Sequence, residues 1–279
     1  MNSNEVFAMK VRLETCKMLK ARGFGHLGGA LSIVEVLSVL FNDVMSVDPQ
    51  NPQDPSRDYF VLSKGHGGPS YYSTLALKGF FDVSLLSTLN NNQTNLPSHP
   101  DRTKTIGIDV TTGSLGQGIS LAVGLAKGFK MSEKSNQVYC VIGDGECNEG
   151  QVWEAIQFIA HHQLDNLLIF IDENHKQLDG TTQSVLNPFD LAKKVEAFGL
   201  FTQRVNGSDV NVIKEAIALA KSKTTVASCI VLDTVKGQGI PYFEQMDDNH
   251  HIRFDETSMA QLDSAIESLE KKLLEVSHD

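Results

Sequence analysis

Three short apolar runs rich in β-branched residues most restrict what this 279-residue chain can fold into. They are VYCVIGD at 138–144, LLIFID at 167–172 and ASCIVLDTV at 227–235. Segments with helical periodicity lie between and around them, near 149–162, 188–198 and 209–222. Strands that are apolar on both faces and alternate with helices form a parallel sheet covered on both sides. The sequence therefore predicts an α/β fold with a doubly wound, mostly parallel sheet and helices on both faces.

The rest of the chain fits the same architecture. Helical periodicity is clear over 4–22, 32–45, 69–79, 82–89 and 257–276, and short strands are expected near 59–62 and 201–205. Ser32, with Glu35 three residues later, matches a capping box and predicts the start of the second helix. No break in composition marks a domain boundary, so residues 1–279 are expected to form one domain.

Charge and cysteine content exclude several classes of function. The net charge is −10 and there are no basic runs, which argues against binding nucleic acid or anionic membrane. The four cysteines fit neither a zinc motif nor a redox pair. No apolar run reaches the roughly 18 residues that span a bilayer, and the N-terminus lacks the apolar core of a signal peptide. A cytoplasmic protein is predicted.

The segment GDGECNEG at 143–150 has the residues that a diphosphate and a metal ion need. Gly143 and Gly145 allow close approach of the backbone at the end of a strand, and the helix that follows offers free N–H groups. Asp144 supplies a hard oxygen ligand. Asn174 lies just past the next strand, and neighbouring parallel strands end at the same edge of a sheet. Asp144 and Asn174 are therefore predicted to share one octahedral magnesium ion.

Three of the nine histidines lie among small or helix-breaking residues, where a ligand can reach the imidazole. They are His26, His66 and His99, and together they predict proton transfer near neutral pH. The sequence predicts no role for His161, His162 and His278, which are expected to be solvated.

Taken in order, these segments resemble the N-terminal half of transketolases. The matching segments are GFGHLGGALS (23–32), LSKGHGGPSYYSTLALKGFF (62–81), SHPD (98–101), DVTTGSLGQGISLAVGLA (109–126), GDGECNEGQVWEA (143–155) and IDENHKQLDG (171–180). The resemblance implies thiamine diphosphate as cofactor, with Mg²⁺ or another divalent cation such as Ca²⁺ or Mn²⁺. It implies Asp144, Asn174 and the main-chain carbonyl of Lys176 as metal ligands, although the family usually has a bulky apolar residue where this chain has Lys176. The implied cofactor contacts are His66, Gly113, Ser114, Leu115, Gly143, Asp144, Gly145, Glu146 and Asn174.

The same resemblance implies the catalytic residues. His26 is expected to contact the donor sugar and help remove its hydroxyl proton, while His66 and His99 are expected to contact donor oxygens and the diphosphate side of the cofactor. A further family histidine corresponds to either His250 or His251, and alignment on the following arginine selects His251. Glu149 and Glu154 are expected in a carboxylate network between two copies of the site, or, as a simpler alternative, as acids favoured near a helix N-terminus.

The resemblance also implies a partner. The pyrimidine-binding domain, which carries the activating glutamate, is expected on a separate C-terminal transketolase subunit, and the two subunits are expected to form a two-fold heterotetramer. The expected reaction transfers a two-carbon ketol unit from a ketose to an aldose. The sugars are either the usual sugar phosphates or a specialised sugar.

Three alternatives remain at this point. A diphosphate-binding chain of a 2-oxoacid dehydrogenase shares the GDG and asparagine signature but lacks the histidine segments. Deoxyxylulose-phosphate synthase is normally one long chain and differs around the second histidine. A remnant that binds cofactor or partner without catalysis would not need Asp144 and Asn174.

Overall fold

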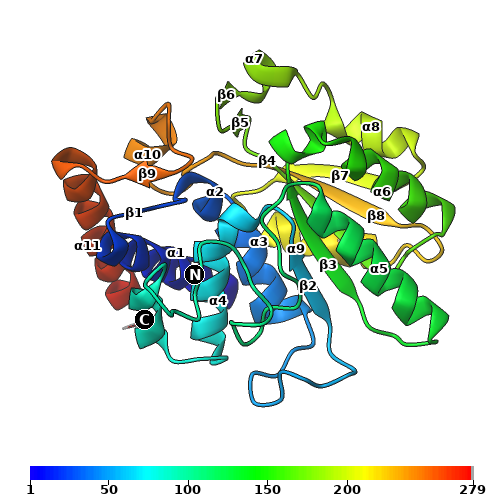
Figure 1. Cartoon of the computed structure of the whole chain (residues 1–279), viewed down its shortest axis with the longest axis horizontal. Helices are drawn as coiled ribbons and strands as arrows, with labels where there is room; N and C mark the ends of the chain where they lie inside the picture. The colour runs from blue at the N-terminus through cyan, green and yellow to red at the C-terminus, as the bar shows by residue number, and fades with distance from the viewer. Residues whose placement is uncertain (278–279) are drawn as a thin grey trace.

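A computed structural model describes residues 1–277, and its centre is a five-stranded, all-parallel sheet (Figure 1). The strand order is β2 (Tyr59–Leu62), β3 (Val138–Gly143), β4 (Leu167–Glu173), β8 (Ser228–Asp233) and β7 (Phe201–Asn206). This confirms the predicted strands and the predicted parallel sheet. In the register of β3 with β4, Gly143 lies opposite Asp172, so the segments that follow both strands begin side by side.

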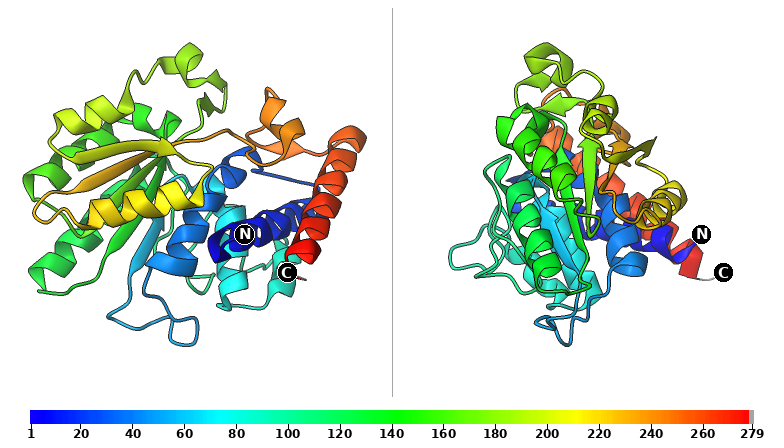
Figure 2. Two further views of the ribbon diagram at one scale, coloured as in Figure 1. Left: turned by 180° about the vertical axis from the view of Figure 1, so that it is seen from behind. Right: turned by 90° about the vertical axis from the view of Figure 1, so that its right-hand side faces the viewer.

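Helices cover both faces of the sheet, as predicted (Figures 1 and 2). Helices α5 (Gln117–Met131), α6 (Gly150–His161) and α8 (Leu191–Ala197) bury one face, with Cys140 and Ile169 among the strand residues beneath them. Helices α1 (Ser3–Arg22), α3 (Val34–Val39) and α9 (Val210–Lys221) bury the other, with Val141 and Phe170 beneath. Alternate strand residues thus enter different cores, which explains the continuous apolar runs.

The two ends of the chain meet on one side of the molecule (Figure 2). Helix α1 packs against α11 (Glu256–Ser277) and α4 (Gly68–Lys78). Two ion pairs join α1 to α11, Lys17–Glu270 at 2.8 Å and Lys20–Asp263 at 2.5 Å. Further short helices are α7 (Thr182–Leu186), α10 (Pro241–Gln245) and 3₁₀ helices at Gly65–Gly67, Val83–Thr88 and Gly145–Asn148.

The helix predicted over 32–45 is present from Val34 to Val44, where α3 passes directly into a π-helical turn, Leu40–Val44. A separate short helix, α2 (Gly28–Leu31), precedes it, and the predicted capping box is wrong. Ser32 is not the N-cap of α3, because its φ of −68° and ψ of −14° are helical and its Oγ donates to Asp172 at 2.7 Å. Glu35 pairs instead with Arg12 at 2.5 Å. The side chains of Ser32 and Glu35 bind residues that are distant in the sequence, and hydrophobic periodicity cannot predict such contacts.

Two small antiparallel ribbons were not predicted. Strand β1 (Phe24–Gly25) pairs with β9 (Ile252–Arg253), and β5 (Lys176–Gln177) pairs with β6 (Gly180–Thr181). The first ribbon brings the segment around His26 beside that around His250, although more than 200 residues separate them. Within the described residues, no helix is long and apolar enough to cross a membrane.

Candidate functional site

A cavity opens where strands β2, β3, β4 and β8 end. Such edges of parallel sheets are where ligands bind. Its wall brings together residues that are far apart in the sequence: His26, Lys64, His66, His99, Gly113, Leu115, Gly143, Asp144, Gly145, Glu146, Asn174, Lys176, Gln177, Leu178, Lys236 and His250.

Asp144 and Asn174 lie on adjacent loops of this wall. The Asp144 carboxylate accepts the N–H of Gly145 at 2.8 Å and that of His175 at 2.6 Å, which ties the two loops together. His175 adopts a positive φ of 62°, turning the chain sharply between Asn174 and Lys176. Burial and the nearby Asp172 charge raise the pKa of Asp144 to about 6. A buried carboxylate held beside an amide oxygen is the kind of ligand set that Mg²⁺ takes.

The loop surfaces also fit a diphosphate. A Cβ on Gly145 would lie 2.9 Å from Cβ of Gln177, and a Cβ on Gly113, whose φ is +154°, would lie 3.4 Å from the His99 ring. Larger residues at Gly113 and Gly145 would therefore narrow the cavity. Gln177 Nε2 is buried and has no hydrogen-bond partner among the described residues, so it is a donor free for a ligand in the cavity it lines. The fit favours an oxygen-rich anionic group beside Asp144 and Asn174.

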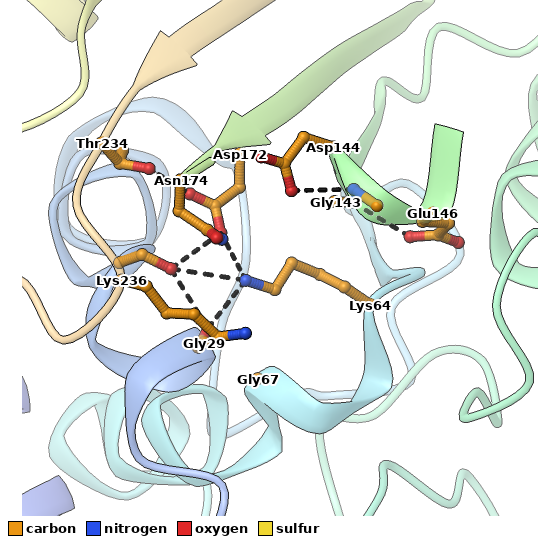
Figure 3. Close-up of polar contacts among 12 residues, drawn as sticks. Gly29, Lys64, Gly67, Gly143, Asp144, Glu146, Asp172, Asn174, Thr234 and Lys236 are labelled. Atoms are coloured by element: carbon orange, nitrogen blue, oxygen red, sulfur yellow. Dashed lines mark hydrogen bonds and ion pairs between the residues drawn. The ribbon is translucent and has the colours of Figure 1, made fainter. Parts of the chain in front are cut away.

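A fully buried lysine supports the loop that carries Asn174 (Figure 3). Lys64 and Asp172 form an ion pair with both side chains at 0% exposure, and Lys64 also donates to the carbonyl of Gly29 at 2.8 Å. Asp172 further accepts Asn174 Nδ2 at 2.8 Å and Thr234 Oγ1 at 2.5 Å. With its amide nitrogen held by Asp172, Asn174 has its amide oxygen fixed in direction.

Glu146 fastens three loops rather than projecting freely into the cavity. Its carboxylate accepts the Ser63 hydroxyl, the Gly116 N–H at 2.8 Å and the Gly143 N–H at 3.0 Å. Burial raises its pKa above the usual value for glutamate. The ends of β2 and β3 and the start of α5 are therefore joined through one side chain.

Five imidazoles form a cluster at the mouth of the cavity, around His26. Its ring centroid lies 5.3 Å from that of His99, 6.0 Å from His66, 5.3 Å from His250 and 4.7 Å from His251. Three of these histidines were predicted to act together, and the fold does bring them together. Crowding of this kind disfavours protonation of more than one ring, because two neighbouring imidazoliums would repel each other.

Burial and neighbouring bases lower the pKa values of four of these histidines, which favours their neutral form. Burial, followed by the influence of His251, His99 and Lys236, lowers the pKa of His26 to about 3. Burial and the Lys236 charge lower the pKa of His250 to about 3. Burial lowers the pKa of His66 well below its ordinary value and lowers that of His99 as well. Neutral imidazoles can donate a hydrogen bond from one nitrogen and accept a proton at the other.

Lys236 lies between the histidine cluster and the loop of residues 174–177. Its Nζ lies 3.0 Å from Nδ1 of His250, 3.3 Å from the carbonyl of Gln177 and 3.4 Å from the carbonyl of Lys176. Burial and the nearby Lys64 ammonium lower the pKa of Lys236 to about 8.

Four predicted site residues do not line the cavity. His251 packs beside His26 and Phe24, so the wall contains His250 rather than the histidine that alignment selected. Ser114 lines an adjoining hollow. Glu149 and Glu154 are exposed on α6 and contribute nothing to the cavity of this chain.

The histidines with no predicted role do not line the cavity where the structure describes them. His161 and His162 lie at the end of α6 and outside the wall, while His278 lies outside the described residues.

Sequence reasoning missed Lys64, Asp172, Gln177 and Lys236. Lys64, Asp172 and Gln177 lie within segments singled out above, and Lys236 directly follows one. The available signal was position: all four lie at or just after the carboxyl end of a strand.

Comparisons with known proteins found similar sequences and similar folds. The family model described as "Transketolase, thiamine diphosphate binding domain" matches residues 3–279. A 6-deoxy-6-sulfo-D-fructose transketolase subunit from Clostridium sp. (strain MSTE9) is 45% identical over 263 residues, which cover 94% of each chain. One of the subunits of the apulose-4-phosphate transketolase from Actinobacillus succinogenes is 38% identical, over 81% of this chain and 82% of its own.

Solved transketolases share the fold. The enzyme from Campylobacter jejuni superposes with a TM-score of 0.85 at 27% identity, covering 99% of this chain and 48% of its own. The enzyme from Pichia stipitis in complex with sedoheptulose-7-phosphate gives a TM-score of 0.85 at 27% identity, covering 98% and 44%. The chain thus spans just under half the length of these enzymes.

Proposed function

This chain belongs to the transketolase family as a thiamine-diphosphate-binding domain, and on that premise we propose that it is the N-terminal subunit of a split, metal-dependent transketolase. The family makes it a transferase. The observation that supports the finer proposal is the pairing of Asp144 with Asn174 at adjacent strand ends, beneath a cluster of neutral histidines.

Three groups of the chain are proposed to hold the metal ion: the Asp144 carboxylate, the Asn174 amide oxygen and the Lys176 main-chain carbonyl. Mg²⁺ suits this set because all three ligands are oxygens, and phosphate oxygens with water would complete an octahedron. Gly113, Leu115, Gly143 and Gly145 would line the bound diphosphate. When bound, thiamine diphosphate supplies the carbanion that cleaves the bond next to a ketose carbonyl.

The histidines are proposed to handle the sugar. His26 lies at the centre of the cluster, and its low pKa leaves a neutral ring that can accept a hydroxyl proton. His66 and His99 flank it and can donate hydrogen bonds to sugar or phosphate oxygens.

A partner chain is proposed to complete the site. The relatives of similar length are named as subunits, and the solved transketolases are about twice as long as this chain. A C-terminal, pyrimidine-binding subunit would supply the glutamate that activates the cofactor, in a two-fold heterotetramer. Glu149 and Glu154 are exposed on α6, where a second copy of the site could reach them.

The donor is proposed to be a ketose with an acidic terminal group. Two relatives are named for 6-deoxy-6-sulfo-D-fructose and for apulose 4-phosphate, which bear a sulfonate and a phosphate. The cavity wall of this chain contains imidazole and amide groups, which can form hydrogen bonds with hydroxyl groups. We therefore propose that this chain binds the sugar hydroxyls and that its partner binds the acidic group.

Calorimetric titration tests the cofactor proposal on the chain alone. Thiamine diphosphate with MgCl₂ should bind to the wild type, and Asp144→Asn should weaken binding by at least about tenfold because a charged metal ligand is lost. Equal binding by wild type and variant would refute the assigned metal site.

Reconstitution tests the reaction. The chain and its C-terminal partner should together transfer a ketol unit from one of the two named donors, and neither should do so alone. Robust transfer by this chain without a partner would refute the split architecture.

A further inference from the structure

The segment that carries Lys236 is locked to the one that carries His250. Asn249 is fully buried, and its Nδ2 donates to the carbonyls of Lys236 at 2.8 Å and Phe243 at 2.7 Å. Its own main-chain carbonyl accepts the N–H of Gly28 at 2.9 Å. The contact between Lys236 and His250 is therefore held by the backbone on both sides.

The Lys236 ammonium has three acceptors for its three protons. They are His250 Nδ1 at 3.0 Å, the Gln177 carbonyl at 3.3 Å and the Lys176 carbonyl at 3.4 Å. A lysine ammonium donates and cannot accept, so the ring nitrogen that it contacts must be the unprotonated one. In a neutral imidazole the proton then resides on the other nitrogen.

We propose that Lys236 is a positioning residue that fixes the tautomer of His250, so that this histidine presents Nε2–H and serves the substrate only as a hydrogen-bond donor. The tautomer follows from the contacts of His250, whereas its role toward the substrate rests on the proposed function. A ring whose Nδ1 is occupied by an ammonium and whose Nε2 carries the proton has no nitrogen left to accept one. Proton acceptance from the sugar hydroxyl then falls to another imidazole, and His26 is the ring in contact with all the others.

The surroundings of His250 support a neutral donor. The groups facing it are Lys236, Lys64 and the rings of His26, His66 and His251. All five are basic side chains, and together with burial each of them acts against the charged form of His250. Nothing nearby favours an imidazolium, whereas a hydroxyl or carbonyl oxygen in the cavity would satisfy Nε2–H.

Nitrogen NMR on the full chain, labelled with ¹⁵N-histidine, reads the tautomer directly. His250→Asn identifies the His250 signals by their loss. We expect the wild type to carry the His250 proton on Nε2 at about neutral pH and to remain neutral on acidification to about pH 5, since a unit charge lies within hydrogen-bond distance. A proton found on Nδ1 would overturn the proposal without any variant.

Lys236→Met removes the ammonium at similar length. The titration midpoint of His250 should rise by at least about one pH unit, and Lys236→Arg should restore the wild-type midpoint. Lys176→Met is the matched control: it removes another lysine that lines the cavity, whose Nζ contacts the Met246 carbonyl instead of His250, and should leave the midpoint unchanged. A smaller shift in Lys236→Met, or an equal shift in Lys176→Met, would contradict the assignment.

These measurements need neither cofactor nor partner. They would therefore stand even if the chain proved inactive in ketol transfer. If the reconstituted enzyme is active, Lys236→Met should raise the KM for the ketose donor more than it lowers kcat, because a ground-state hydrogen bond is lost.

Discussion

Replacing Lys64 by methionine should destabilise the chain more than almost any other single change at one charged residue. Both Lys64 and Asp172 have 0% side-chain exposure. Removing one partner of such a pair leaves a buried charge and typically costs about 3–5 kcal/mol. Asp172 keeps three donors, from Ser32, Asn174 and Thr234, so we expect the lower end of this range, about 3 kcal/mol. That is a large part of the roughly 5–15 kcal/mol that stabilises a typical domain.

Urea unfolding followed by circular dichroism measures this cost. Lys64→Met with Asp172→Asn removes both charges and should cost less than the sum of the two single changes by at least about 1.5 kcal/mol. Lys17→Met, which breaks an ion pair whose side chains are 41% and 46% exposed, should change stability by less than about 1 kcal/mol. A loss below about 1 kcal/mol for Lys64→Met, or additive single changes, would refute the view that the buried pair acts as a unit.

Three further outcomes follow from contacts in the structure. Gly118→Ala should cost at least about 2 kcal/mol in urea unfolding, because its Cβ would lie 2.5 Å from Cα of Ser63. Gly124→Ala, on the same helix with open space around it, should instead stabilise by about 0.5–1 kcal/mol, and equal effects would contradict the packing. Gln177→Leu should weaken calorimetric binding of thiamine diphosphate with magnesium by about tenfold, through loss of an unpartnered donor, and unchanged affinity would count against that contact. The folded pKa of His26 is about 3 against an ordinary value of 6.5, so below pH 6.5 the unfolded chain takes up a proton that the folded chain does not. Stability should fall on acidification, and His26→Asn should reduce that slope by up to about 1.4 kcal/mol per pH unit; an unchanged slope would argue that His26 titrates normally.

The sheet could be predicted from the sequence because each strand carries its own signal. Residues that alternate between two cores give uninterrupted apolar runs, and the helices between them show periodicity. The ribbon of Phe24–Gly25 with Ile252–Arg253 has no such signal. Strands of two residues are stabilised only by their distant partner strand, so the sequence of either segment alone does not predict them.

The site was only partly predictable for a related reason. Asp144 and Asn174 follow strands, and glycine marks the first of them, so local pattern was sufficient. Lys64 carries no local signal of its buried position, because lysine is almost never fully buried unless it is paired. Its partner Asp172 is 108 positions away. Ser32 was misassigned as a helix cap because its true acceptor is that same Asp172.

Charge balance in the cavity indicates why metal and cofactor should bind as a pair. The wall contains three lysines, Lys64, Lys176 and Lys236, against the carboxyl groups of Asp144 and Glu146 in the wall and Asp172 behind it. Basic and acidic groups are therefore equal in number, and burial lowers the pKa values of the neighbouring His26 and His250 to about 3. A divalent cation alone would add two uncompensated charges to a poorly solvated site, and a diphosphate alone would add negative charge beside two carboxylates. Bound together, the two offset each other, so MgCl₂ titrated without cofactor should bind at least about tenfold more weakly than in its presence. Equal magnesium affinity with and without thiamine diphosphate would mean that the wall itself supplies the compensating charge.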